Sequence, residues 1–320
     1  MTAEITRLSE TSRRRFARLL RTFGPWLVAA AILFAILRRV RPAEIAAAVR
    51  AGHVGRVVPV AAAYAILQLV TIATADWTLV RAILPRVRWR ELAPIKAGAT
   101  SVQSIAWVAS QGAYAAWIVR KTGIGVRNAG GVFLAFALCD WTAGTLVLST
   151  ALWLARPAAP RVLYLLAPAA PLALLALLLI PRRRPLDPHG EAGVSRVLRA
   201  IPRRAYVASI AWRVASSSVV YSTTWAAMRA FGLHVPFGVV AAYVPLLLAI
   251  GALPISVGGF GAVQGAWLLF TPWAPAAQIL GFQLAWNLLQ MAGQVLRGLP
   301  FVRRVVVGVA RGMSPPPQRS

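Results

Sequence analysis

Residues 253–267 read LPISVGGFGAVQGAW and follow the apolar run YVPLLLAI at 243–250. The first stretch contains one proline and four glycines, the residue types that least favour a helix interior. A break of this kind inside an apolar region frees backbone N–H and C=O groups. At membrane depth such groups are tolerated only where they are buried in protein or line a wet cavity. We therefore predict a broken or re-entrant segment here.

The composition around this stretch is typical of a membrane protein. The 320 residues are 58% hydrophobic and 13% charged, whereas soluble domains have about 25% charged residues. Apolar runs of the length that crosses a bilayer recur along the chain. The expected fold class is an all-α, polytopic transmembrane helical bundle of about eight spans. We place the spans at 25–37, 57–80, 129–154, 162–180, 206–230, 237–253, 255–271 and 276–296.

The charge is strongly positive, with 35 Lys and Arg residues against 8 acidic ones. The arginines lie between apolar runs, which favours membrane anchoring and anionic lipid headgroups over nucleic acid. The positive-inside rule predicts a protein of the inner (cytoplasmic) membrane with both termini cytoplasmic, although the five arginines of 38–56 oppose this orientation. The expected division is a basic lead-in (1–22), an N-terminal membrane half (23–180), a basic cytoplasmic loop (181–204), a C-terminal membrane half (205–300) and a basic Pro-rich tail (301–320).

A second interrupted segment lies in the N-terminal half. Residues 92–119 are membrane-like but contain Ser, Gln and Gly, and basic residues stand at both ends of the segment. The positive-inside rule then places both ends on one side, so we predict a re-entrant piece. Gln111-Gly112-Ala113 and Gln264-Gly265-Ala266 lie one in each half, with a tryptophan four residues after the first set (Trp117) and directly after the second (Trp267). Matched interruptions in two pseudo-related halves indicate a transport site; close helix packing through glycine is the alternative.

These residues resemble a known family. The stretch LPISVGGFGAVQGA, together with Gly112, the turn Arg120-Lys121-Thr122-Gly123 and Asp140, is similar to the lysylphosphatidylglycerol synthase transmembrane-region family over about residues 20–300. The resemblance implies a flippase-like membrane domain. The family usually has glutamate where Ala113 and Gln264 stand here. The Gln264 amide can still donate and accept hydrogen bonds.

Three ionisable residues, Asp76, Asp140 and Arg213, fall within or near the ends of expected spans. Charges inside a membrane are costly, and they indicate a functional site. We hypothesise that Arg213 pairs with Asp140 or Asp76. Placement of all three at the interface is the alternative, since Asp76 and Asp140 are each followed by tryptophan.

Catalytic patterns are absent from the sequence. The three histidines lie in expected loops or at helix ends, the lone Cys139 lies in an apolar run, and no zinc, Walker or nucleophile-elbow motif occurs. We expect no cofactor and no metal, and the sequence favours a role other than catalysis.

The expected function is binding or translocation of an anionic phospholipid or polyprenyl-linked glycolipid across the cytoplasmic membrane. A lipid-modifying transferase, or a membrane subunit or scaffold that serves an enzyme partner, is the alternative. The expected substrate-binding residues are Gly112, Arg120, Asp140, Arg213, Pro254, Ser256, Gly258, Gly259, Gly261 and Gln264.

Overall fold

The computed structural model describes residues 40–103, 107–155, 193–251, 256–257 and 260–312, together with residues 34, 36–38, 172, 176 and 179. This part of the chain is almost entirely helical, and its only strands form one short hairpin. The predicted all-α class is therefore confirmed for the described residues. The expected spans at 25–37 and 162–180 lie largely outside them, as does the first part of the basic loop.

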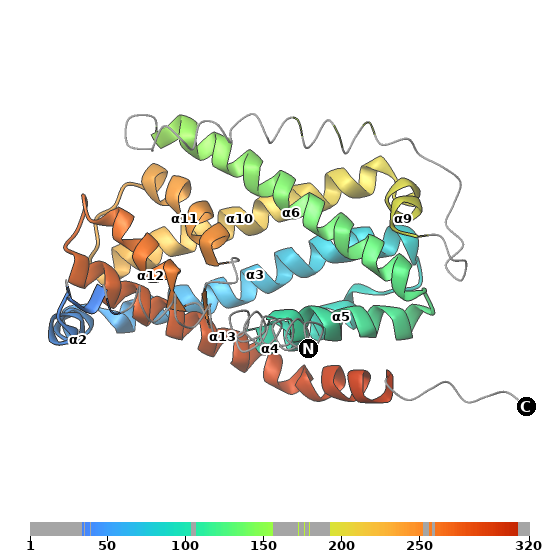
Figure 1. The fold of residues 1–320 in the computed structure, drawn as a ribbon, viewed down its shortest axis with the longest axis horizontal. Coiled ribbons are helices and arrows are strands. Elements are labelled where there is room, and N and C mark those ends of the chain that lie inside the picture. Colours follow the sequence, from blue (N-terminus) through green and yellow to red (C-terminus); the bar gives the residue numbers. More distant parts are fainter. Residues whose placement is uncertain are drawn as a thin grey trace, which may run out of the picture.

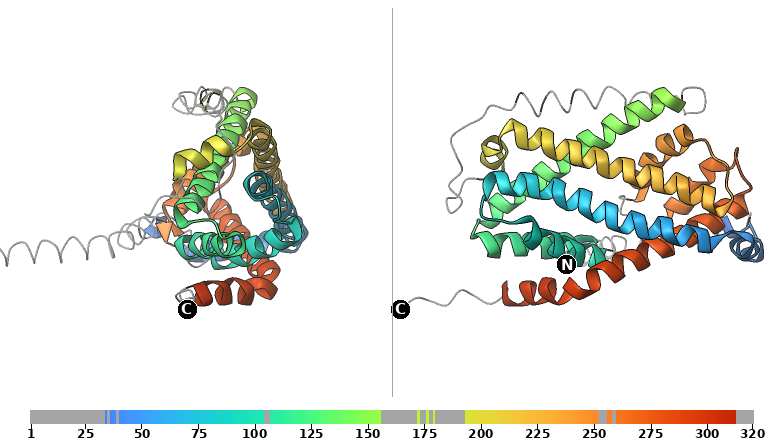
Figure 2. Two further views of the ribbon diagram at one scale, coloured as in Figure 1. Left: turned by 90° about the vertical axis from the view of Figure 1, so that its right-hand side faces the viewer. Right: turned by 180° about the vertical axis from the view of Figure 1, so that it is seen from behind.

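Four long helices run along the molecule: α3 (Val54–Ile83), α6 (Val126–Ala155), α10 (Arg203–Phe231) and α13 (Ala276–Gly312) (Figure 1). They cover the expected spans at 57–80, 129–154, 206–230 and 276–296. At about 1.5 Å per residue, the 30 residues of α3 extend about 45 Å, more than a bilayer core. Two of the described helices, α3 and α6, are long and apolar enough to cross a membrane. Viewed from behind, α3 and α10 lie side by side (Figure 2).

Residues 92–119 fold into a helical hairpin. Its arms are α4 (Trp89–Gln103) and α5 (Trp107–Thr122), with 15 and 16 residues. Each arm extends only about 22–24 Å, less than the roughly 30 Å of a bilayer core. The open end of the hairpin lies near the end of α3 and the start of α6 (Figure 1), and Lys121 Nζ contacts Glu91 Oε1 across it at 2.9 Å. The hairpin therefore enters and returns at one end of the molecule, as the sequence predicts.

The second interrupted segment is broken into short elements, as the sequence predicts. After α11 (Phe237–Gly251) come β1 (Ser256–Val257), β2 (Phe260–Gly261), α12 (Ala262–Trp267) and the 3-10 turn η2 (Leu268–Phe270). The strands are antiparallel, with Ser256 opposite Gly261. The expectation of a span at 255–271 is wrong, because the proline and glycines replace a continuous helix with short elements. The described part of α11 covers 15 residues of the expected span at 237–253 and ends at Gly251, where the described residues stop.

The two interrupted segments lie toward opposite ends of the long helices. Segments α11 and α12 pack against each other at the end where α13 begins, away from the open end of the α4–α5 hairpin (Figure 1). Shorter helices flank the bundle: α2 (Pro42–Ala51) contacts α13, and α9 (Val194–Ala200) contacts α6. One large hydrophobic cluster is built around the α4–α5 hairpin, and another joins α11 to α13 and α10.

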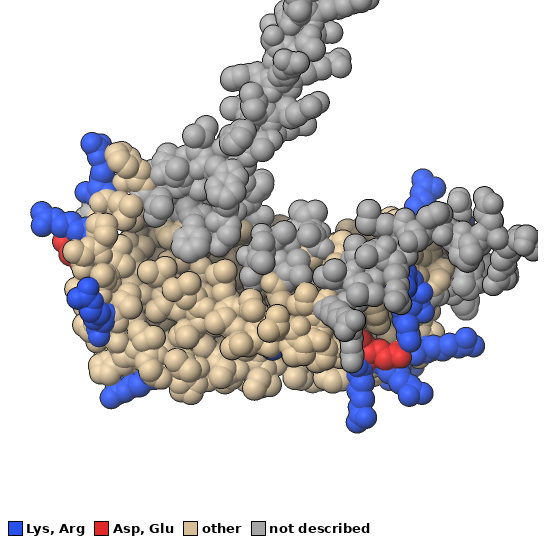
Figure 3. Space-filling view, turned by 90° about the horizontal axis from the view of Figure 1, so that it is seen from below, with Lys and Arg blue, Asp and Glu red and all other residues tan. Residues whose placement is uncertain are grey.

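The surface carries its charge at the two ends. In Figure 3 lysine and arginine side chains gather at both ends of the visible face, and a band of uncharged residues lies between them. Large apolar side chains in the middle of the long helices are exposed, including Ile66 and Leu67 of α3 and Leu134 of α6. Such a band matches the hydrocarbon layer of a bilayer.

Candidate functional site

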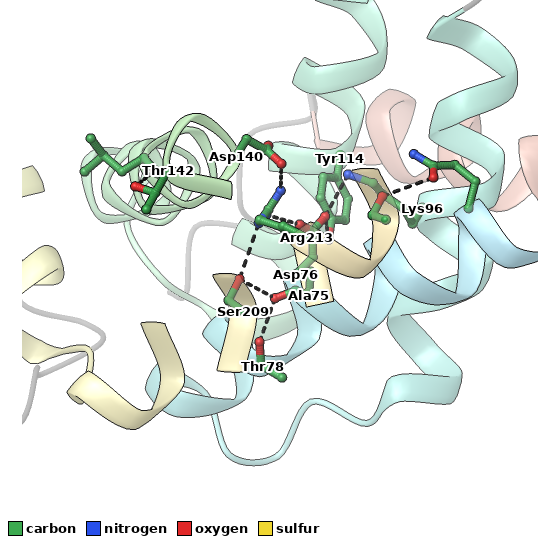
Figure 4. Close-up of polar contacts among 12 residues, drawn as sticks. Ala75, Asp76, Thr78, Lys96, Tyr114, Asp140, Thr142, Ser209 and Arg213 are labelled. Atoms are coloured by element: carbon green, nitrogen blue, oxygen red, sulfur yellow. Dashed lines mark hydrogen bonds and ion pairs between the residues drawn. The ribbon is translucent and has the colours of Figure 1, made fainter. Parts of the chain in front are cut away.

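A buried ion-pair cluster joins three of the long helices. Arg213 of α10 contacts Asp76 of α3 at 2.6 Å through Nη2, and its Nη1 donates to Asp140 of α6 (Figure 4). The side chains of Arg213 and Asp76 are each 1% exposed, whereas that of Asp140 is 54% exposed. The hypothesis that Arg213 pairs with one of these acids is confirmed, and it pairs with both. Arg213 and Asp76 are both buried inside the protein, whatever their depth in the membrane.

The α4–α5 hairpin supplies a second cation to the same cluster. Lys96 of α4 contacts Asp76 Oδ2 at 2.7 Å, and the Tyr114 hydroxyl of α5 donates to the same oxygen at 3.3 Å. The Lys96 ammonium also lies 4.9 Å from the centre of the Tyr114 ring, a cation–π contact. Asp76 therefore connects α3 with α10 and with both arms of the hairpin.

Contacts with Ser209 and Phe136 hold the guanidinium of Arg213 in place. The Arg213 Nε donates to Ser209 Oγ at 3.3 Å, and that hydroxyl donates to the Ala75 carbonyl at 3.0 Å (Figure 4). The guanidinium carbon also lies 5.6 Å from the Phe136 ring centre. Buried ion pairs need such additional hydrogen bonds to offset the loss of hydration.

Beside this cluster is a charged cavity of about 460 Å³. Three cations lie in it or against it, and only two acids accompany them. The residues that line it are Tyr64, Gln68, Ile72, Asp76, Lys96, Thr100, Gln111, Phe133, Phe136, Ala137, Asp140, Gln294 and Arg297. Arg213 reaches the cavity wall through its contacts with Asp76 and Asp140.

Arg297 of α13 is the cation of this cavity that has no acidic partner among the described residues. Its Nη1 donates to the Ala65 carbonyl, and its Nε is buried without a hydrogen-bond partner among the described residues. In that part of the chain the acids of the cavity pair with Arg213 and Lys96 instead. The cavity therefore has a guanidinium with unused donor capacity.

A second cavity of about 420 Å³ continues from the first. Both are lined by Tyr64 and Gln68, so the two adjoin along α3. The second is rich in amides and aromatic rings, and no charged side chain lines it among the residues that the structure describes. Its walls are Tyr64, Gln68, Val220, Thr224, Val244, Leu247, Leu248, Gly251, Val263, Trp267, Gln283, Trp286, Asn287 and Gln290.

Two helical stripes produce this continuous polar surface. On α3 the lining residues recur every fourth position from Tyr64 to Asp76, which covers about 18 Å on one helix face. On α13 the polar lining residues also follow helical spacing: Gln283, Asn287, Gln290, Gln294 and Arg297. Neither stripe is among the expected site residues. Polar residues at intervals of three and four within an apolar run are the signal that would have revealed both.

The comparison with known families agrees with this architecture. The family described as the lysylphosphatidylglycerol synthase TM region matches residues 16–298. The chain belongs to this family. A comparison with curated proteins finds no match. Membership of the lysylphosphatidylglycerol synthase TM-region family makes the chain a membrane protein related to lipid handling.

Within this family domain, the expected site residues of the N-terminal half fall into two groups. Asp140 lines the charged cavity and contacts Arg213 of the C-terminal half. Gly112 follows the cavity-lining Gln111, and a Cβ on Gly112 would meet no described atom within 4 Å. Close packing therefore does not explain Gly112. Arg120 is exposed near the open end of the hairpin and does not line either cavity.

The expected residues of the opening motif are only partly described. Ser256 and Gly261 pair across the short hairpin. Gln264 is 5% exposed and lies between Val263 and Trp267, which line the amide cavity. Pro254, Gly258 and Gly259 lie outside the described residues.

The carboxylates that line the charged cavity lie on different helices from the two Gln-Gly-Ala segments. Ala113 and Gln264, which stand where the resemblance implies glutamates, are both buried. The carboxylates that line a cavity are Asp76 on α3 and Asp140 on α6. Because both are already engaged by cations, the site is suited to bind anions rather than cations.

Proposed function

We propose that this protein binds a lipid through its anionic headgroup and moves it across the cytoplasmic membrane without hydrolysing ATP itself. The observation that carries the proposal is Arg297, a guanidinium with a buried donor and no acidic partner among the described residues, at the wall of the charged cavity. A charge at such depth is costly unless it is paired. A phosphate group is a suitable partner, because arginine binds it with charge-assisted hydrogen bonds.

The charge balance supports the same ligand. Lys96, Arg213 and Arg297 carry three positive charges, and Asp76 and Asp140 carry two negative ones. The difference of one positive charge favours an anion of single charge, such as a phosphodiester. Lys96 is 14% exposed, so its ammonium stays accessible from the cavity while it contacts Asp76.

The polar stripe of α3 supports movement as well as binding. It extends about 18 Å through the uncharged band of the protein, a large part of the roughly 30 Å of a bilayer core. A headgroup could follow this stripe while its acyl or prenyl chains stay in the surrounding hydrocarbon. The interrupted helices on either side are the kind of element that forms substrate sites in transporters.

The test is leaflet exchange in liposomes that contain the purified protein. Fluorescent phosphatidylglycerol in one leaflet is followed after quencher addition, with phosphatidylcholine as the zwitterionic comparison. Arg297→Gln should slow phosphatidylglycerol exchange roughly tenfold or more, because a charge-assisted hydrogen bond contributes about 1.5–3 kcal/mol. Arg56→Gln is the matched control, since Arg56 is exposed at the start of α3.

Two results would count against the proposal. One is exchange no faster than in protein-free liposomes although the protein melts cooperatively. The other is equal exchange by wild type and Arg297→Gln. The first result would favour a membrane subunit that serves an enzyme partner, and co-purifying proteins would then be sought.

A further inference from the structure

We infer that the two adjoining cavities form one bipartite site for a phosphate-linked sugar: the charged cavity takes the phosphate, and the amide cavity takes an uncharged, polyhydroxylated headgroup. The inference rests on the proposed function and names the class of its substrate. It follows from the different chemistry of the two cavities and from the residues that they share.

The amide cavity has the groups that recognise hydroxyls. Gln68, Gln283, Asn287 and Gln290 line it, and each amide offers both donors and an acceptor. A sugar hydroxyl also donates and accepts, so amides match it without a net charge. The cavity volume of about 420 Å³ falls within the range of small-molecule sites.

Aromatic rings form the apolar part of the same wall. Trp267 and Trp286 line the cavity and are 6% and 3% exposed, and Tyr64 is 8% exposed. Trp286 is held by Tyr64 and Phe282, whose ring centres lie 5.7 and 6.3 Å from its own. The C–H faces of a sugar ring pack against such aromatic surfaces while its hydroxyls meet the amides. Rigid rings with a few polar groups give a site orientation and specificity.

The geometry links this cavity to the phosphate position. Tyr64 and Gln68 line both cavities, and Gln68 Oε1 accepts a hydrogen bond from Ser216 at 3.1 Å, which fixes the shared amide. Along α13, Asn287 and Gln290 precede Arg297 by ten and seven residues, or about 15 and 10 Å of helix rise. A phosphate at Arg297 therefore leaves room for one or two sugar rings beside the amides.

The same residues disfavour a cationic headgroup. An aminoacyl lipid carries an ammonium group that needs a carboxylate or another concentrated negative charge nearby. Within the described part of the chain no acidic residue lines the amide cavity, and both acids of the charged cavity already contact arginine or lysine. A lipid phosphate without a sugar would leave the amides without a ligand.

The experiment measures binding to the purified full-length protein in nanodiscs by native mass spectrometry. Three probes are used: a short polyprenyl-phosphate glucose, the same polyprenyl phosphate without sugar, and lysylphosphatidylglycerol. The wild type should bind the glucosyl probe roughly tenfold more tightly than the other two, since two or more added hydrogen bonds contribute about that factor.

Variants separate the two cavities. Asn287→Leu combined with Gln290→Leu should reduce affinity for the glucosyl probe roughly tenfold and leave the sugar-free phosphate unchanged. Arg297→Gln should weaken both phosphate probes. Gln278→Leu is the matched control, because Gln278 is an exposed amide of the same helix. Thermal melting of each variant verifies that it is folded.

Several outcomes would overturn the inference and leave the proposed function intact. Equal affinity for the glucosyl and sugar-free phosphates would show that the amides do not bind a sugar. Tighter binding of lysylphosphatidylglycerol would assign a cationic headgroup. An equal loss of affinity for the glucosyl and the sugar-free phosphate in the double variant would show that the amides have a structural role. Failure of the proposed function looks different, since phosphatidylglycerol exchange would then be no faster than in protein-free liposomes, whichever of the three probes binds.

Discussion

Arg213 and Asp76 form an ion pair of 2.6 Å in which each side chain is only 1% exposed. The two residues lie 137 positions apart in the sequence, on α10 and α3, so the contact joins the N-terminal and C-terminal halves. Asp76 also accepts hydrogen bonds from the re-entrant hairpin through Lys96 and Tyr114. The stability of the bundle and the geometry of the charged cavity therefore depend on the same carboxylate.

Arg213→Gln should destabilise the protein strongly. The substitution leaves the buried Asp76 with Lys96 alone and removes the cation that contacts Asp140, and loss of one partner of a buried pair costs about 3–5 kcal/mol. The measurement is the melting temperature in detergent, followed by size-exclusion chromatography. Asp140→Asn should lower the melting temperature less than Arg213→Gln does, because the Asp140 side chain is 54% exposed. Similar melting of wild type and Arg213→Gln would contradict the assigned pairing.

Gly298→Ala should destabilise the contact between α13 and α4. A Cβ on Gly298 would overlap Ser101 Oγ and the Ala97 carbonyl. The helices would have to separate, and the 2.8 Å hydrogen bond from Ser101 to the Gln294 carbonyl would be lost. Overpacking of this kind costs about 1–3 kcal/mol, measurable as a lower melting temperature.

Gly112→Ala is the control for this substitution, because a Cβ there meets no described atom within 4 Å. It should leave stability unchanged or raise it slightly, since alanine favours a helix more than glycine does. A larger loss for Gly112→Ala than for Gly298→Ala would contradict the packing of α13 on α4.

The ion pair at the open end of the hairpin should give a small pH dependence. The hydrogen bond from Lys121 lowers the pKa of Glu91 below its ordinary value. A lowered glutamate pKa adds stability that is complete above the ordinary value and is lost as the pH falls through the lowered one. The difference in melting temperature between wild type and Glu91→Gln should therefore shrink on acidification below about pH 4.

The effect at this pair should be modest and sensitive to salt, because both side chains are more than one third exposed. Salt should reduce the advantage of the wild type over Glu91→Gln near neutral pH. A difference that grows as the pH falls would contradict the ion pair.

Both arms of the α4–α5 hairpin should be accessible from the same side of the membrane. In a Cys139→Ala background, Arg90→Cys and Lys121→Cys place thiols at the start of α4 and the end of α5. Both should react with an impermeant maleimide from one side, and Arg56→Cys should react from the other. Arg90, Lys121 and Arg56 are exposed, whereas the native Cys139 is buried. Labelling of Arg90→Cys and Lys121→Cys from opposite sides would show that the segment crosses the membrane.

The sequence predicts the parts of this fold that depend on local pattern. Long apolar runs identify α3, α6, α10 and α13, and the flanking basic residues identify the α4–α5 hairpin. The pairing of Arg213 with aspartate follows from the cost of an unpaired charge inside a membrane. The proline and glycines of 253–267 predict the break in the second segment, whereas hydropathy alone gives a continuous span at 255–271 that the structure does not form.

The cavities depend on which helix faces meet, and a single sequence does not specify those contacts. Lys96 reads as a flanking basic residue of the re-entrant segment, yet it contacts Asp76 inside the protein. Arg297 reads as part of the basic tail, yet it lines the charged cavity. Lysine and arginine side chains can extend several ångströms from the helix that carries them. The sequence therefore does not show whether such a side chain points to solvent or into the protein.

The opposed hairpins also have an electrical consequence. If the bundle spans the membrane as proposed, the two adjoining polar cavities replace part of the hydrocarbon layer between α4–α5 and α11–α12. The transmembrane potential would then fall mainly across the part of the layer that the cavities do not occupy. A singly charged phosphate that passes this region experiences about 2.3 kcal/mol per 100 mV over a short path. The resting potential of the cell would thus act as a directional force on an anionic lipid.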